Sequence, residues 1–189
     1  MSDPAFKTMS VAEYLRTEEE SPIKREYVDG FVYPLHGQAG TTTAHDLLTG
    51  NIFVRLHALA RRAGCFAHTS DMRVTTADRR TYYYPDAMVT CEPRDDEARF
   101  KVAPCLLVEV LSRSTAHHDH RAKYHAYTSL PSLQTYLLVD QYARHVYAYQ
   151  RDPEGWTLTQ YAGQGVIPLP ALDGELTLDE IYEGVLSSD

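Results

Sequence analysis

Two stretches of the chain space their apolar residues as one face of a helix. In residues 43–62 the apolar positions recur every three or four residues, and Gly64 follows the last of them, so a long helix is predicted there. A second helix is predicted from residue 10 to about residue 20, because Ser10 and Glu13 have the S-x-x-E spacing of a capping box. Elsewhere the pattern changes mostly to that of strands.

The strand-like segments are short and lie mostly in the middle of the chain. Asp29-Gly30 lies between β-rich runs within residues 24–35, which is typical of a hairpin. The segment CLLVEVLS, residues 105–112, is nearly continuous in apolar residues, as expected for a strand buried on both faces. Further strands are predicted at residues 65–76, 82–91, 135–140 and 145–151, with a hairpin-like region at 156–161, a helix at 115–128 and a short final helix capped by Thr177 and Glu180.

The order of these elements indicates the fold class. A helix, three strands, a second helix and further strands make a mixed sheet of the α/β (α+β) class. With 189 residues the chain is expected to form a single domain, 1–189, with a core at about residues 24–151 and a C-terminal segment at 152–189.

The negative charge is concentrated in that C-terminal segment. The chain has 18 Lys+Arg and 26 Asp+Glu, a net charge of −8, and residues 152–189 contain eight acids and no Lys or Arg. Residues 1–151 are therefore balanced, and we expect the C-terminal segment to face away from any nucleic acid or to meet a partner subunit. We find no apolar run long enough to cross a membrane and no signal peptide, so a cytoplasmic protein without membrane association is expected.

The three cysteines, Cys65, Cys91 and Cys105, are widely spaced and form no C-x-x-C pair. This odd number and spacing argue against a disulfide framework and against a structural zinc site. Cys91 and Cys105 lie among Val, Leu and Ala, so they are expected to be small core residues. A reducing cytoplasm is the compartment that fits this pattern.

Two acids occupy positions where a carboxylate needs an explanation. Glu109 stands in the middle of the apolar segment LLVEVL, where an uncompensated carboxylate would be strongly destabilising. A metal ion, an ion pair or a raised pKa would each compensate it. Asp86 follows Pro85, which belongs at a strand start or edge because it has no N–H to donate. Asp86 is therefore expected at the mouth of a strand, although Pro-Asp is also common in turns.

The helix predicted after Glu109 carries polar residues on one face. Asp119, Lys123 and Tyr127 have i, i+4, i+8 spacing, so their side chains lie on the same side of that helix. An Asp four residues before a Lys is also a common pair on exposed helix surfaces. Both interpretations remain open on spacing alone.

Taken together, these segments resemble the Uma-type family of putative restriction endonucleases, within the PD-(D/E)XK nuclease superfamily. The resemblance covers roughly residues 8 to 185. The superfamily places its Lys two residues after the Glu, where this chain has Leu111, and Lys123 matches the position in the following helix to which the Uma-type family has moved it. The segments that carry the resemblance, in order, are REYVDGFVY, His45, YPDAMV, LLVEVLSRST, the D-x-x-x-K-x-x-x-Y spacing of residues 119–127, and LQTYLLVD.

The resemblance implies a restriction-endonuclease-like core, helix, three strands, helix, strand, with added hairpins. It also implies that Asp86, Glu109 and the backbone carbonyl of Val110 hold Mg²⁺ or Mn²⁺, since hard oxygen ligands suit these ions. Lys123 would orient or deprotonate the attacking water or stabilise the developing oxyanion. The carboxyl groups of Asp86 and Glu109 are expected to converge on one ion.

Three further positions match the family as accessory residues. Glu26 is expected to extend the metal site, or alternatively to pair with Lys24 or Arg25 at the edge of the hairpin. His45 has either a role in the site or one in helix capping and packing. Asp119 is expected to position Lys123 or to cap its helix near the N-terminus, where the helix dipole favours a carboxylate.

The activity that the resemblance implies is metal-dependent endonucleolytic hydrolysis of phosphodiester bonds in DNA by a homodimer. A catalytically degraded nuclease fold that serves as a nucleic-acid-binding or assembly module is the first alternative. A metal-dependent phosphodiesterase acting on RNA or nucleotides is the second, because loops and not the fold set the substrate.

Overall fold

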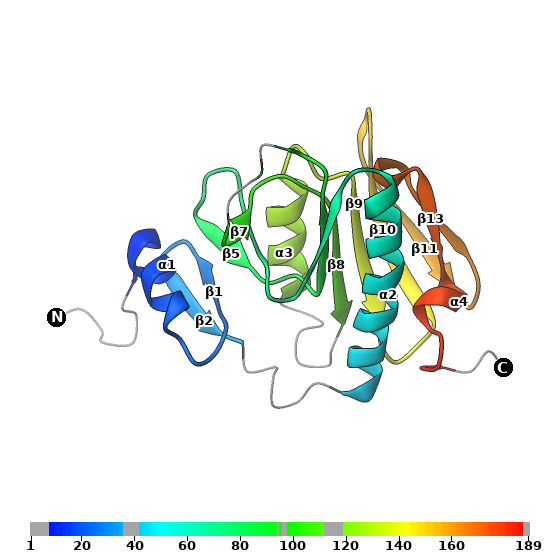
Figure 1. Ribbon diagram of the computed structural model, residues 1–189, viewed down its shortest axis with the longest axis horizontal. Helices are drawn as coiled ribbons and strands as arrows, with labels where there is room; N and C mark the ends of the chain where they lie inside the picture. The colour runs from blue at the N-terminus through cyan, green and yellow to red at the C-terminus, as the bar shows by residue number, and fades with distance from the viewer. Residues whose placement is uncertain (1–7, 36–41, 94, 96–97, 112–118, 187–189) are drawn as a thin grey trace.

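A six-stranded sheet forms the centre of the computed structural model (Figure 1), which describes residues 8–35, 42–93, 95, 98–111 and 119–186. Strands β8 and β9 run parallel, and every other neighbouring pair is antiparallel. In spatial order the strands are β11 (Gly155–Ala162), β10 (His145–Asp152), β9 (Thr135–Asp140), β8 (Pro104–Leu111), β6 (Ala87–Thr90) and β3 (Phe66–Thr69).

Helices cover both faces of this sheet. Helix α2 (Thr43–Arg62) packs its apolar face on one side, and its first turn is capped by the hydroxyl of Thr42. Helix α3 (Asp119–Thr128) lies on the opposite side, over β8 and β9 (Figure 1). Because α2, β3, β6, β8, α3 and β9 follow one another along the chain, the core runs helix, three strands, helix, strand. This confirms the mixed α/β fold class expected from the sequence.

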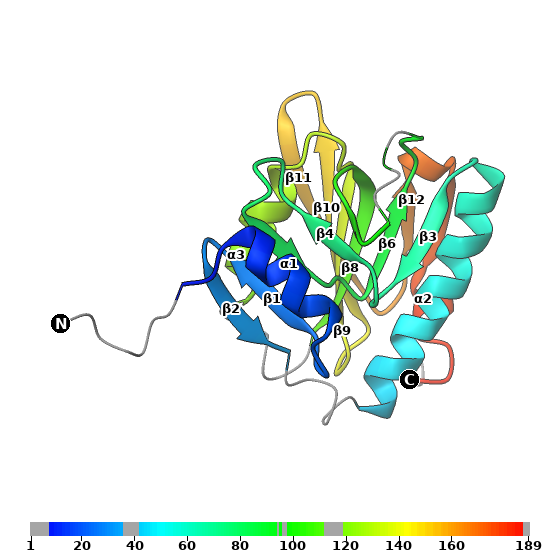
Figure 2. The same cartoon turned by 60° about the vertical axis from the view of Figure 1, so that its left-hand side comes forward.

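A second, smaller sheet stands beside the α3 face. Its order is β2-β1-β5-β4-β7, and helix α1 (Val11–Glu19) packs across one face of it (Figure 2). The β1–β2 turn is made by Asp29 and Gly30, whose φ angles of 48° and 99° suit the tight turn of a hairpin. The strands are β1 (Arg25–Val28), β2 (Phe31–Pro34), β4 (Arg73–Thr75), β5 (Thr81–Tyr83) and β7 (Phe100–Lys101).

The acidic C-terminal segment packs on the main core. Its first strand, β11, belongs to the main sheet, and the rest forms the hairpin β12 (Val166–Leu169) and β13 (Gly174–Thr177), the 3-10 helix η2 (Pro170–Leu172) and helix α4 (Leu178–Ile181). The apolar side chains of these elements join the cluster beneath α2. Two of its acids are compensated by cations of the core, since Arg55 lies 3.5 Å from Glu180 and Arg144 pairs with Asp179.

Several predicted elements agree with the structure and two differ. The 43–62 helix and the 135–140 strand are confirmed with their bounds, and the Thr177–Glu180 capping box is present. The predicted strands at 65–76 and 82–91 are wrong as single units, because each divides between the two sheets. The second divides around Pro85, which cannot donate to a ladder. No helix in the described part of the chain has the length and apolarity to cross a membrane.

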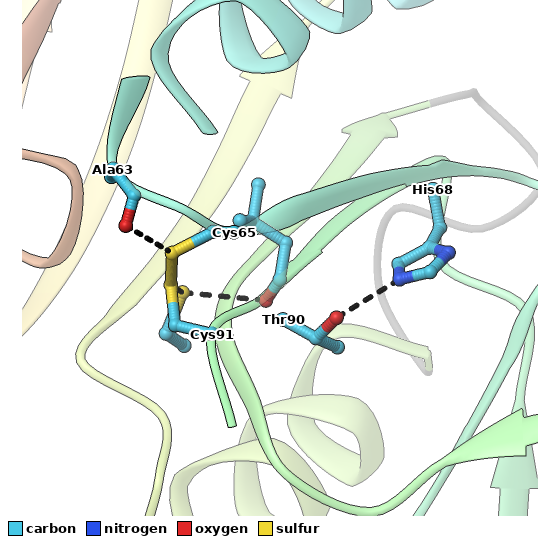
Figure 3. The surroundings of a disulfide bond; sticks show 7 residues. Ala63, Cys65, His68, Thr90 and Cys91 are labelled. Atoms are coloured by element: carbon cyan, nitrogen blue, oxygen red, sulfur yellow. Dashed lines mark hydrogen bonds between the residues drawn. A yellow bond between two sulfur atoms is a disulfide. The ribbon is translucent and has the colours of Figure 1, made fainter. Parts of the chain in front are cut away.

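The cysteines contradict the sequence-based expectation. Cys65 and Cys91 form a disulfide across 26 positions of sequence, joining the end of α2 to the end of β6 (Figure 3). Cys105 is a buried free thiol whose sulfur lies 3.2 Å from that of Cys91. The expectation of no disulfide was wrong because sequence spacing does not show which strand ends meet in the fold.

Candidate active site

The site begins at Glu109, near the carboxyl end of β8. Side chains alternate across a strand, so Val108 and Val110 point into the cluster under α2 while Glu109 points to the α3 side. Its side chain is only 13% exposed. Burial raises the pKa of Glu109 to about 8, and the nearby Asp86 adds to that rise. The fold therefore holds a carboxylate where it needs a cation nearby.

Lys123 supplies a positive charge next to it. The Lys123 Nζ lies 3.2 Å from Glu109 Oε1, 3.3 Å from Glu109 Oε2 and 3.2 Å from Glu26 Oε1. The Lys123 side chain is 8% exposed, and its ammonium also lies 5.4 Å from the centre of the Tyr83 ring. Lys123 thus points into the protein and bridges two carboxylates, which a lysine on an exposed helix face would not do.

Tyr127 is a site residue to which the sequence analysis assigned no role. It lies one turn after Lys123 on α3, and its hydroxyl donates a hydrogen bond of 2.7 Å to Glu109 Oε1. Burial, reinforced by the charge of Glu109, raises the pKa of Tyr127 well above its ordinary value, so its proton stays in place. The i+8 spacing from Asp119 placed it on the right helix face, but only the fold shows which carboxylate it contacts.

Asp86 reaches the same strand from the start of β6. Its carboxylate Oδ2 accepts a hydrogen bond of 2.7 Å from the backbone N–H of Val110. Its own backbone N–H donates to the Val108 carbonyl at 3.1 Å. The Asp86 carboxylate therefore lies against the strand segment that carries Glu109, and its charge helps to raise the pKa of Glu109.

His45 lies in the first turn of α2 and contacts Asp86. Its Nε2 is 3.5 Å from Asp86 Oδ1, and this contact raises the pKa of His45 against the opposing effect of burial. The helix cap is a different residue, because the hydroxyl of Thr42 accepts the hydrogen bond from the His45 backbone N–H at 3.1 Å. Helix capping therefore does not explain the position of the His45 imidazole beside Asp86.

Glu26 comes from β1, in the smaller sheet, and is buried. It accepts a hydrogen bond of 3.3 Å from the Tyr84 backbone N–H in addition to the contact with Lys123. The basic neighbours expected as alternative partners bind elsewhere: Arg25 pairs with Glu18 and Lys24 with Asp71. Glu26 thereby ties the hairpin to the segment between β5 and β6 and to α3.

The donor set fits a hard divalent cation only if the main chain contributes. Within the described residues, no three His, Cys, Asp or Glu side chains form a metal-binding group. The Val110 carbonyl is the main-chain oxygen that would be available, because the N–H and C=O of one residue in an extended strand point to the same side. The Val110 N–H points at Asp86, so its carbonyl faces that side too.

Asp119 is the first residue of α3, and its side chain lies outside the described part of the structure. Asp86, Glu109, Lys123, Glu26, His45 and Val110 come together from β6, β8, α3, β1 and α2. The site thus draws on both sheets and both covering helices.

Known proteins of similar sequence cover most of the chain. Two uncharacterized proteins of Synechocystis match it: slr1290 is 31% identical over 95% of this chain and 94% of its own. The second, sll1609, is 37% identical over 84% of this chain and 90% of its own.

A solved structure shares the fold. The crystal structure of a putative nuclease belonging to DUF820 from Anabaena variabilis superposes with a TM-score of 0.74, at 16% sequence identity, over 94% of this chain and 99% of that chain. This likeness supports the nuclease-like fold.

A family model described as "Uma2: Putative restriction endonuclease" matches residues 11–180. This match confirms the resemblance noted in the sequence and supports a nuclease-type, hydrolytic function acting on nucleic acid. With that model spanning most of the sequence, the chain belongs to the Uma2 family of putative restriction endonucleases.

Proposed function

We propose that this protein is a metal-dependent endonuclease that hydrolyses phosphodiester bonds in DNA. One observation carries the proposal: the Lys123 ammonium lies 3.2 Å from the buried Glu109 carboxylate, on the strand whose next residue contacts Asp86. Two carboxylates and an adjacent buried amine are the groups that a hydrolytic phosphodiesterase needs. The family description of the chain agrees with this chemistry.

Asp86, Glu109 and the Val110 carbonyl would hold Mg²⁺, or Mn²⁺ in its place, because all three offer hard oxygen ligands. When bound, such a cation lowers the pKa of a coordinated water and neutralises charge on the scissile phosphate. His45 holds Asp86 from the side of α2, 3.5 Å away, and so fixes the direction of that carboxylate.

Lys123 is the group that we assign to proton handling. Its ammonium is held on one side by Glu26 and on the other by Glu109, so it is presented at a fixed place beside the proposed ligands. From there it orients the attacking water or donates a hydrogen bond to the developing negative charge on the phosphate. The hydrogen bond from the Tyr127 hydroxyl holds the Glu109 carboxylate in place beside Lys123.

A homodimer is the assembly that we propose, because two copies of the chain would provide two sites for two strands, paired or single. This part of the proposal rests on family resemblance. Sedimentation of the purified chain, with and without DNA, tests it directly.

The decisive experiment is digestion of single-stranded, double-stranded and branched DNA, and of RNA, in Mg²⁺ or Mn²⁺. The wild type should cleave DNA internally and lose this activity in EDTA. A doubly substituted Asp86→Ala, Glu109→Ala protein is the negative control. Equal cleavage by this control would overturn the site assignment. Binding without cleavage would favour a degraded nuclease module, and cleavage of RNA alone would favour the second alternative.

A further inference from the structure

An exposed aromatic side chain lies next to the proposed site. Tyr33, on β2, is 51% exposed, and β2 is an edge strand of the smaller sheet. Phe31, two residues earlier on the same strand, is 36% exposed. Side chains two residues apart on a strand point to the same face, so both rings lie on one side of the β1–β2 hairpin.

Strand register places Tyr33 beside Glu26. The two residues are direct cross-strand partners in the antiparallel β1–β2 pair, and such partners point to the same face with Cβ atoms about 5 Å apart. Glu26 is the buried residue whose Oε1 lies 3.2 Å from the Lys123 ammonium. The Tyr33 ring therefore stands at the outer border of the Lys123 site.

The two faces of this hairpin have different surroundings. On the opposite face, Tyr27 and Val32 pack into the aromatic cluster beneath α1. On the Glu26 face, Val28 packs toward the α3 cluster, while the ring of Tyr33 extends beyond it into solvent. Packing in a hydrophobic core therefore does not explain why position 33 is aromatic.

The negative charge at the site indicates that nucleic acid is bound by more than attraction of its phosphates. Glu26, Glu109 and Asp86 bring three carboxylates together, and the Lys123 ammonium is already shared by two of them. A phosphate backbone gains little from such an arrangement until a cation is bound. Stacking of a base on an aromatic ring, in contrast, is independent of that charge and tolerates any base.

We infer that Tyr33 is a stacking platform for an unpaired nucleobase next to the scissile phosphate, so that the preferred substrate is single-stranded DNA. In a duplex each base face is covered by its neighbours, and a ring on an edge strand does not reach it. In a single strand the base faces are free, and one can stack on Tyr33 while its phosphate lies over Lys123. This inference rests on the proposed function for the substrate class.

The test measures binding separately from cleavage. The probe is a fluorescently labelled 12-nucleotide oligothymidine, titrated against the full chain in Ca²⁺ to allow binding without turnover. Tyr33→Ala should weaken binding by roughly 5- to 100-fold, the range that alanine substitution of a stacking residue gives. Tyr33→Phe, which keeps the ring, should stay within about twofold of the wild type.

Phe66→Ala is the matched control. Phe66 is 70% exposed on β3, also an edge strand, and it pairs with Thr90, at the other end of β6 from Asp86. Its substitution should leave binding unchanged. The second probe is an oligonucleotide of equal length with abasic positions. The wild type should bind this abasic strand as weakly as Tyr33→Ala binds the intact strand. Tyr33→Ala should bind the abasic strand with the same affinity as it binds the intact strand, because the ring and the base act as one pair.

The outcomes separate this inference from the proposed function. If DNA is cleaved but the wild type binds intact and abasic strands equally, or prefers duplex, the stacking inference is wrong and the nuclease assignment stands. If stacking is observed in Ca²⁺ but no nucleic acid is cleaved in Mg²⁺ or Mn²⁺, the catalytic assignment fails and the base-binding surface stands. An absence of binding to any strand overturns both.

Discussion

The hydroxyl of Tyr127 donates a 2.7 Å hydrogen bond to the same Glu109 carboxylate that lies 3.2 Å from the Lys123 ammonium. The two donors come from consecutive turns of α3 and hold one carboxylate from one side. Hydrogen bonding and charge both favour the ionised form of that carboxylate, whereas burial disfavours it. Helix α3 therefore supplies both groups that favour ionisation of this acid, which is the form that the proposed metal ligand requires.

Replacement of Tyr127 by Phe tests this support. The ring would keep its packing while Glu109 loses its donor, so we expect the protein to lose about 1–2 kcal/mol of unfolding free energy. Cleavage should fall, and higher Mg²⁺ should restore part of it, since the carboxylate is misplaced but present. Urea denaturation and a Mg²⁺ titration of activity measure the two effects. Unchanged activity at limiting Mg²⁺ would show that Tyr127 is only a packing residue.

Single substitutions of the two proposed ligands separate chemistry from folding. Asp86→Ala and Glu109→Ala should each reduce Mg²⁺-dependent cleavage to background while circular dichroism and thermal unfolding show a folded protein. Removing Glu109 leaves Lys123 paired with Glu26, so the buried amine keeps a partner. Glu175→Ala, an exposed acid on β13, is the matched control and should cleave as the wild type does. Loss of activity in the control variant would point to a general effect of acid removal.

The spacing of apolar residues and the capping residues predicted those elements that depend only on neighbouring positions in the sequence. Helix α2 has an apolar face, a Thr cap and a following glycine, and its bounds agree with the prediction. The strand segments 65–76 and 82–91 failed because sheet membership is decided by tertiary pairing, and each segment leaves one sheet to join the other. The Cys65–Cys91 disulfide has the same origin, since it joins positions that only the fold brings together.

The site was predictable in its members and less so in its contacts. The apolar surroundings singled out Glu109, whereas the helix spacing left Lys123 open and the family resemblance assigned it. Their connection to Glu26 depends on how the β1–β2 hairpin packs against the sheet, and no local pattern carries that information. The hydrogen bond from Tyr127 depends likewise on the rotation of α3 over β8.

Removing the buried ammonium should be costly for stability as well as for activity. Lys123→Met leaves the buried Glu26 without its ammonium partner, and breaking a buried ion pair in this way costs about 3–5 kcal/mol. Lys24→Met is the control, because its partner Asp71 is largely exposed and such pairs contribute about 1 kcal/mol or less. Urea denaturation of both variants at neutral pH measures the difference. Equal losses would contradict the special position of Lys123.

Loss of the disulfide should destabilise the protein without changing the site. Closing a loop of this length is worth about 3 kcal/mol in the chain-entropy model, so Cys65→Ser or reduction should lower the unfolding free energy by that order. Cys105→Ala, which removes the neighbouring free thiol, should keep the Cys65–Cys91 disulfide and should therefore still respond to reductant. Thermal unfolding with and without dithiothreitol measures this. An identical midpoint in both conditions would show that the bond is not formed in solution.

The raised pKa of Glu109 gives stability a pH dependence of definite sign. Its pKa is about 8 in the fold against an ordinary value of 4.5, so between these values the native state binds a proton that the unfolded state has released. The contribution of Glu109 to the unfolding free energy is therefore largest below about pH 4.5 and falls as the pH rises toward about 8. In metal-free buffer the wild type should lose stability across this range relative to Glu109→Gln, which cannot titrate. The proposed Mg²⁺ site requires the ionised form, so Mg²⁺ should raise the thermal midpoint of the wild type at pH 8 and have little effect on Glu109→Gln. Parallel stability curves for the two proteins, with no response to Mg²⁺, would show that Glu109 is neither a buried acid of raised pKa nor a metal ligand.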